Sequence, residues 1–150
     1  MLNRLVSAVA GAVILAGAAL AASPGSPVNM TRMGNAIHGY DSVAYHTMGK
    51  AVVGDPDIAY EWRHSTWLFA SAAHRDLFAA DPDKYVPAYG GYCAYAVTFG
   101  LKIDVDPHAW SIVGGRLFLN ESMVVRRAWQ QDTGHYITNG DLSWDEIKYK

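Results

Sequence analysis

One stretch in the second half of the chain decides the fold: Ala109-Trp110-Ser111-Ile112-Val113-Gly114-Gly115-Arg116-Leu117-Phe118-Leu119-Asn120. Two apolar runs flank a pair of glycines, and this pair matches the backbone conformation that a tight β-turn requires. The stretch therefore predicts an antiparallel β-hairpin. Upstream, the aromatic-rich runs Ile58–Trp62 and Thr66–Ala70 enclose a short polar connection and predict a second hairpin.

Short helices are expected around the hairpins. Residues 71–80 begin with serine, a good N-cap, and they stop before Asp81-Pro82, because proline disfavours helical geometry in the residue that precedes it. Asp41 likewise begins a short helix that Gly49 can end. Both segments are short enough to pack against a hairpin.

The second half of the chain continues this mixture. Residues 89–97 contain two adjacent glycines followed by small and aromatic residues, which predicts a sharp bend that enters a buried helix. We expect residues 121–131 to be helical and residues 136–150 to form a weakly patterned tail. The order of elements does not alternate as in a parallel βαβ sheet, so the sequence predicts an α+β fold, a small single domain with antiparallel β-hairpins packed against short helices.

The first residues of the chain indicate export. Arg4 is followed by an uncharged run over residues 5–20 and then by small residues, which is typical of a cleavable signal peptide spanning residues 1–22. A retained membrane anchor is the less favoured alternative, because the run is shorter than the roughly 20 residues that cross a bilayer. Residues 23–35 are rich in chain breakers and predict a flexible leader, and residues 36–150 form the predicted domain. We expect a periplasmic or secreted protein with no permanent membrane span after cleavage.

Composition narrows the possible partners and the sources of stability. With 150 residues the chain is long enough for one domain, and its net charge of -2 supplies no basic stripe for nucleic acid. A single cysteine, Cys93, excludes a disulfide within the chain. Stability must therefore come from packing, to which five Trp and nine Tyr contribute large buried areas.

Several blocks of sequence resemble the exported YHS-domain proteins of bacteria. They run in order over about Ile37 to Trp144: Ile37–Tyr45, Trp67–Ser71, Pro82–Tyr85, Tyr89–Ala94, Asp106–Trp110 and Leu117–Asn120. Related short domains occur beside heavy-metal transport ATPases and in some aromatic-hydrocarbon hydroxylases, where paired cysteines suggest metal handling. The resemblance therefore implies a small binding domain. This chain departs from the paired pattern, because its one cysteine cannot build a cysteine-rich zinc site.

A metal site of another kind is a hypothesis that rests on Cys93, His38 and His46. A thiolate is the softest ligand available, and sulfur combined with imidazole suits Cu(I), so copper is the most plausible ion. The alternative is that Cys93 is a small buried side chain, because free cysteine is among the most buried residue types. Each histidine could equally be an ordinary surface or hydrogen-bonded imidazole.

Tyr40, Asp41 and Tyr92 are the candidate ligand-binding residues. Asp41 could coordinate a cation, although an aspartate before a short helix is more simply an N-cap. No catalytic residue is assigned, because the chain lacks the His-Glu-x-x-His, Gly-x-Ser-x-Gly and phosphate-loop patterns.

These observations favour an exported YHS-domain binding module for a transition-metal ion or a small ligand. The alternative is a non-catalytic protein-interaction module that docks an envelope protein through an aromatic face. An enzyme that uses the Cys93 thiol is a third possibility, which requires an accessible sulfur with a low pKa.

Overall fold

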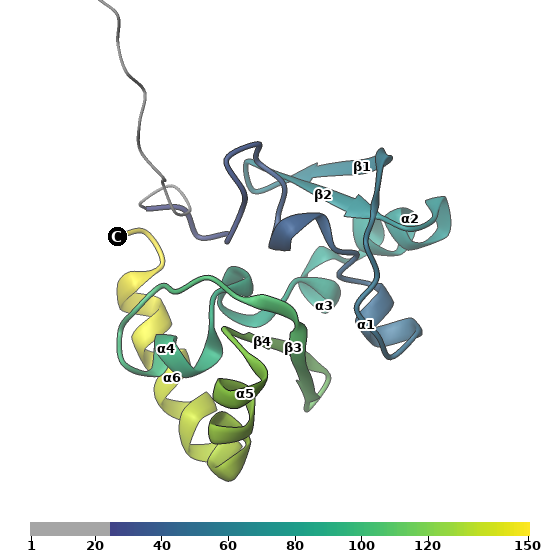
Figure 1. Ribbon diagram of the computed structural model, residues 1–150. Coiled ribbons are helices and arrows are strands. Elements are labelled where there is room, and N and C mark those ends of the chain that lie inside the picture. The colour runs from purple at the N-terminus through teal and green to yellow at the C-terminus, as the bar shows by residue number, and fades with distance from the viewer. Residues whose placement is uncertain (1–24) are drawn as a thin grey trace, which may run out of the picture.

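The computed structural model describes residues 25–150, so the expected signal peptide over residues 1–22 lies outside the described residues. Two antiparallel hairpins organise the chain: β1 (Asp55–Trp62) pairs with β2 (Ser65–Phe69), and β3 (Asp106–Val113) pairs with β4 (Arg116–Asn120). With short helices packed on each hairpin, the expected α+β fold is confirmed (Figure 1). Within residues 25–150, the helices are all too short or too polar to cross a bilayer.

Both hairpins close with two-residue turns. In the first, Trp62 pairs with Ser65 across Arg63 and His64, and both turn residues adopt positive φ angles of 49° and 57°. In the second, Val113 pairs with Arg116 across Gly114-Gly115. Positive φ at both central residues is the conformation whose twist matches antiparallel strands, and glycine adopts it without steric cost.

The first hairpin contacts the 3-10 helix η1 (Ile37–Gly39) and the helix α2 (Ala72–Ala80) (Figure 1). The helix α1 (Ala44–Thr47) meets β3 through the rings of Tyr45 and Trp110, and α3 (Pro82–Tyr85) contacts α2 and β4. The expected serine cap is present, since the Ser71 hydroxyl accepts a hydrogen bond from the His74 backbone N–H at 3.2 Å. At the other end of α2, Asp81 begins α3 directly and its carboxylate accepts from the Lys84 N–H. The helix breaker predicted at Asp81-Pro82 therefore separates two helices.

The remaining helices are grouped around the second hairpin. They are the 3-10 helix η2 (Ala88–Gly91), α4 (Ala94–Thr98), α5 (Met123–Trp129), the 3-10 helix η3 (Gln130–Asp132) and α6 (Thr133–Ile147). The helix expected over residues 89–97 is thus a tight turn followed by the short α4. The tail expected over residues 136–150 is mostly the long helix α6, and that prediction was wrong.

Gly140 explains why α6 looks weak in the sequence. A glycine inside a helix normally lowers its stability. Here a Cβ at Gly140 would lie 2.6 Å from Oη of Tyr89, so the residue must be glycine for the helix to pack on the Tyr89 ring. Tertiary packing therefore outweighs the local preference.

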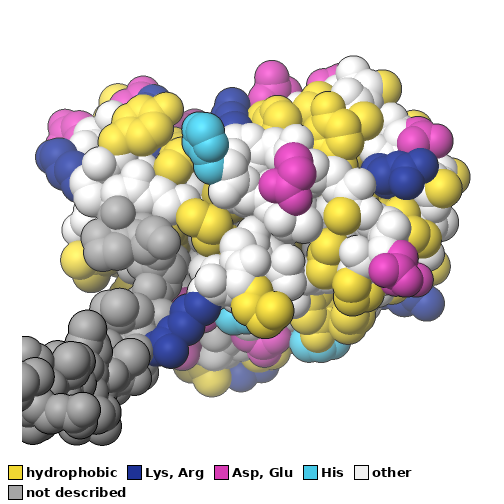
Figure 2. All heavy atoms as spheres, turned by 90° about the horizontal axis from the view of Figure 1, so that it is seen from above, with side chains coloured by type: hydrophobic (Ala, Val, Ile, Leu, Met, Phe, Trp, Pro, Cys, Tyr) yellow, Lys and Arg dark blue, Asp and Glu magenta, His cyan; other side chains and the backbone are white. Residues whose placement is uncertain are grey.

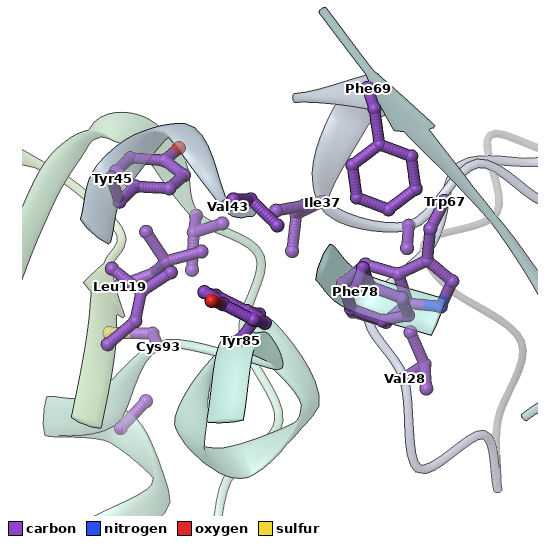
Figure 3. Close-up of a cluster of buried hydrophobic side chains, with 14 residues drawn as sticks. Val28, Ile37, Val43, Tyr45, Trp67, Phe69, Phe78, Tyr85, Cys93 and Leu119 are labelled. Atoms are coloured by element: carbon purple, nitrogen blue, oxygen red, sulfur yellow. The ribbon is translucent and has the colours of Figure 1, made fainter. Parts of the chain in front are cut away.

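Two aromatic-rich clusters form the core. In the first, Phe78 stacks on Trp67 with ring centroids 5.0 Å apart and also meets Phe69 at 5.2 Å. Figure 3 shows this cluster continuing through Ile37 and Val43 toward Tyr85 and Cys93. In the second, Phe118 packs against Trp129 at 5.0 Å. Large rings thus supply the buried area that a chain without disulfides needs.

The segment that begins at Gly25 is packed against the domain. Val28 is fully buried, and the Asn29 backbone N–H donates to the Gly90 carbonyl at 2.9 Å. The Asn29 side chain donates to the Gly91 carbonyl at 3.1 Å. The flexible leader expected over residues 23–35 is therefore corrected for its described part, because Gly90 and Gly91 let a second backbone come close enough to pair.

Candidate functional site

Cys93 lies inside the first core cluster. Its side chain is 1 % exposed, and Figure 3 shows the sulfur among Leu119 and Tyr85. The Sγ atom donates a long hydrogen bond of 3.7 Å to Oδ1 of Asn120. Burial raises the pKa of the thiol, so the thiolate that catalysis or copper binding needs is disfavoured.

His38 and His46, the two histidines predicted to bind a metal with Cys93, contact different residues instead. Nε2 of His38 lies 2.7 Å from Oδ1 of Asp104, and this hydrogen bond raises the pKa of the imidazole. His46 packs edge-on against the Tyr85 ring with centroids 5.5 Å apart, and burial lowers its pKa. Among residues 25–150 the side chains of His, Cys, Asp and Glu form no group of three or more that could hold a metal ion. The structure therefore does not bring Cys93, His38 and His46 together as a ligand set.

The hydroxyls of the two predicted tyrosines, Tyr40 and Tyr92, have partners outside the predicted ligand set. Tyr40 directs its hydroxyl to Nε2 of His108 at 3.3 Å, and the two rings meet edge-on. Tyr92 is buried, and its hydroxyl donates to the backbone carbonyls of Ser26 and Val28 at 3.3 and 3.4 Å. Tyr92 therefore fastens the segment that begins at Gly25 to the domain.

Asp41 is a fully buried carboxylate whose oxygens are both occupied. Oδ1 accepts from the backbone N–H groups of Val43 and Ala44 at 2.9 and 3.1 Å, so Asp41 caps the start of α1 as predicted. Oδ2 accepts from the backbone N–H of Ala70 at 2.9 Å and meets Nδ1 of His74 at 2.6 Å. One carboxylate thus joins α1, the end of β2 and α2.

The other face of His74 extends this network. Its Nε2 lies 3.0 Å from the hydroxyl of Thr47, which gives the order hydroxyl, imidazole, carboxylate that hydrolases use. The Thr47 hydroxyl also donates to the Val43 carbonyl at 3.2 Å, as threonine commonly does inside a helix. The Thr47 hydroxyl thus links His74 to the backbone of α1.

A cleft of about 480 Å³ opens on another part of the surface. It lies where the β1–β2 turn, α3, η2, the β3–β4 turn and the end of α6 come together. Its lining is Pro27, Arg63, Asp83, Lys84, Val86, Pro87, Ala88, Tyr89, Gly90, Gly114, Gly115, Arg116, Trp144, Lys148 and Tyr149. Segments that are distant in the sequence therefore share one concave surface.

Left-handed backbone forms one wall of this cleft. Tyr89 and Gly90 have φ angles of 57° and 59°, and a Cβ at Gly90 would lie 1.8 Å from the Pro27 carbonyl oxygen. A non-glycine residue at positive φ is uncommon and marks a place where the surroundings enforce the conformation. The Tyr89 hydroxyl supplies that restraint, since it donates to Oδ1 of Asp141 at 3.0 Å.

Lysine and arginine side chains surround the cleft, and the carboxylates that pair with them lie at different distances. Arg116 makes a two-pronged ion pair with Asp141, at 3.1 and 2.9 Å. Lys148 pairs with Asp145 at 2.8 Å, and that hydrogen bond raises the pKa of Lys148 while the nearby charge of Arg63 opposes the rise. Arg63 itself meets Asp83 only at 3.6 Å.

Lys84 is the exception among these cations. Its ammonium group lies 5.3 Å from the centroid of the Tyr85 ring, and within residues 25–150 no carboxylate pairs with it. Sequence spacing does not group Lys84, Arg116 and Lys148, because nothing in it links a helix end, a turn and the end of α6. Only the glycine pairs at 90–91 and 114–115 marked the surrounding segments as unusual.

Residues 25–150 thus form a small α+β domain with a buried aromatic core and a polar cleft rimmed by aromatic and basic side chains. Comparisons of the chain with protein-family models, with curated proteins and with solved structures found no match. The site geometry therefore carries the functional argument.

Proposed function

We propose that this chain is an exported binding module of the YHS-domain type that holds a small organic ligand in the cleft beside Tyr89. The observation that carries the proposal is the cleft itself, whose volume of about 480 Å³ falls in the range of small-molecule sites. Export and the YHS relationship are supported by the signal-like residues 1–22 and by the blocks of sequence between Ile37 and Trp144.

Binding is favoured over catalysis by the state of the nucleophiles. The Cys93 thiol is buried with a raised pKa, and the Thr47 hydroxyl is engaged with a helix carbonyl. The buried thiol is not accessible, and the exposed Thr47 hydroxyl is bound to the Val43 carbonyl as well as to His74. We therefore propose a non-catalytic role.

An organic ligand is favoured over a copper ion by the same placement. Copper binding would need Cys93 and the two histidines to rearrange, since they do not form a ligand group among residues 25–150. The cleft, by contrast, is already formed, and a site that needs no reorganisation before binding loses less free energy on association.

The interaction-module alternative draws on exposed apolar side chains. Phe99, Leu101 and Ile103, in the loop after α4, are 61, 53 and 42 % exposed. Figure 2 shows that apolar side chains on one face form separate groups divided by polar atoms, with charges of both signs scattered among them. A docking surface usually has a larger continuous apolar patch than the separate groups on this face, so we place the proposed site in the cleft.

Amide NMR spectra of the isotope-labelled protein would test the proposal. A mixture of small acids, amines and neutral aromatic compounds is added, and signal changes are mapped onto the structure. We expect the changes to concentrate at Gly90, Gly114, Gly115 and the Trp144 indole, which line the cleft. Gly49 and Gly100, two glycines in turns outside the cleft lining, serve as internal controls and should not shift. Changes confined to residues 99–103, or no change at any compound, would contradict the proposal.

A further inference from the structure

We infer that the cleft selects an organic anion, a flat ring that carries a carboxylate or phosphate head. This inference rests on the proposed function, and it names the chemical class of the ligand. It is carried by the charge, the geometry and the aromatic side chains of the cleft lining.

The lining is asymmetric in charge. Four of its side chains are cationic, Arg63, Lys84, Arg116 and Lys148, and only one is a carboxylate, Asp83. They come from four separate segments, namely the β1–β2 turn, α3, the start of β4 and the residue after α6. Asp83, Asp141 and Asp145 pair with Arg63, Arg116 and Lys148, so among the described residues the lining cation without an ion pair is Lys84.

Positive charges held together repel one another, and a bound anion relieves that repulsion. Arg63 is close enough to Lys148 to influence its pKa, and Lys84 has no ion pair among the described residues. The Asp83 carboxylate is 83 % exposed and lies 3.6 Å from Arg63, which is a weak arrangement in water. A ligand carboxylate or phosphate would supply the negative charge that Lys84 does not receive from a carboxylate of the described residues.

Arg116 is held in position to donate to such a head group. Its guanidinium forms two hydrogen bonds to Asp141 and lies 5.0 Å from the Phe118 ring centroid. A guanidinium has five N–H donors, and the two bonds to Asp141 together with the interaction with the Tyr89 hydroxyl leave donors for an incoming anion. The Tyr89 hydroxyl binds the same carboxylate and keeps Asp141 in place. Because the Arg116 guanidinium is already held in place, an anion that binds to it loses less free energy in ordering the side chain.

Aromatic side chains provide the surface for a flat ring. Trp144 and Tyr149 line the cleft, and the Trp144 ring packs against Tyr89 and Tyr92, each with a ring centroid 6.0 Å away. Rings fixed in this way offer an offset or edge-on contact to a planar ligand. The limited volume of about 480 Å³ favours a small molecule over a polymer.

A charge series of nearly identical shape would test the inference: benzoate, benzamide and benzamidinium. Dissociation constants are measured by amide NMR at low salt. We expect benzoate to bind at least about fivefold more tightly than benzamide, and benzamidinium to bind most weakly, because one unit charge near the cations favours the anion by roughly that factor. Phenyl phosphate, measured beside benzoate, distinguishes a phosphate head from a carboxylate.

A matched pair of variants assigns the effect to the cleft. Lys84→Gln removes the unpaired cation and should weaken benzoate about threefold while leaving benzamide unchanged. Lys50→Gln removes an exposed lysine outside the cleft lining and should change neither constant. Equal binding of all three compounds, or tighter binding of benzamidinium, would overturn the anion assignment but leave a ligand-binding cleft. Failure of the broader compound mixture at the cleft would overturn the proposed function itself.

Discussion

Two regions of the molecule bring charged side chains together from separate segments. In one region the charged group is buried and hydrogen-bonded, and in the other a cation is exposed and lacks an ion pair among the described residues. Around Asp41 the carboxylate is fully buried and accepts hydrogen bonds from three backbone N–H groups while it contacts His74. In the cleft, Lys84 is exposed and has no ion pair among the described residues. A buried charge must be satisfied by the protein, whereas a charge at an open cleft is satisfied by water until a ligand replaces it. The first region therefore builds the fold, and the second is available for binding.

The largest expected effect comes from breaking the closed region. Asp41→Ala leaves three backbone donors and the His74 ring without their acceptor, so we expect the free energy of unfolding to fall by about 3–5 kcal/mol. Urea denaturation measures this loss. Asp76→Asn, which changes an exposed carboxylate on α2, is the control and should alter stability by less than about 0.5 kcal/mol. An Asp41→Ala protein as stable as the control would refute the structural role.

A second test concerns the sealed thiol. Because Cys93 is 1 % exposed and its pKa is raised, iodoacetamide should alkylate the native protein at least about 100-fold more slowly than the urea-unfolded chain. Mass spectrometry follows the reaction over time. Rapid alkylation of the folded protein would reopen the thiol-enzyme hypothesis, which needs an accessible sulfur.

The smallest expected effect is on the pH dependence of stability, to which His38 and His46 should contribute with opposite signs. The pKa of His38 is raised in the folded state, so its contribution is present below the unfolded value of about 6.5 and is lost as pH rises through the folded value. Burial raises the pKa of Asp104, but hydrogen bonds from His38, Asn29 and Val105 outweigh it and lower the pKa to about 2, so Asp104 stays charged throughout. His38→Gln should therefore destabilise the protein by at most about 1 kcal/mol near pH 5 and by less near pH 9, because the pair is partly exposed.

His46 has the opposite sign and provides the comparison. Burial lowers its pKa, so its neutral form is favoured in the folded protein and stability is lost as pH falls through the unfolded value of about 6.5. Urea denaturation of wild type and of each histidine variant across pH measures both slopes. If His38→Gln and His46→Gln changed the pH dependence in the same direction, the assignment of the two environments would be wrong.

The local elements were predictable where a side chain or a turn determines them by itself. Gly114-Gly115 specified the second hairpin, and Ser71 specified the start of α2. α6 was missed because the reason for Gly140 is the Tyr89 ring, which is remote in sequence. The packing of Val28 was missed for the same reason, since its segment pairs with the backbone at Gly90.

The candidate site was less predictable than the fold. The hypothesis that Asp41 is a cap followed from one local rule and is confirmed. A cleft, by contrast, depends on which distant segments the fold brings together, and Lys84, Arg116 and Lys148 have no common pattern. The spacing of residues along the sequence shows which side chains are neighbours on one helix or strand. It does not show which side chains from four separate segments lie together.

The Gly25 backbone N–H donates to the Lys150 carbonyl at 3.0 Å, so the two ends of the described chain meet, as Figure 1 also shows. Pro27 and Tyr149, close to these ends, both line the cleft. In mechanical terms, a force that pulled the two ends apart would act first on this hydrogen bond and on the rim of the cleft, while the aromatic core carried little of the load. Tension applied at Gly25 and Lys150 should therefore distort the cleft before the domain unfolds.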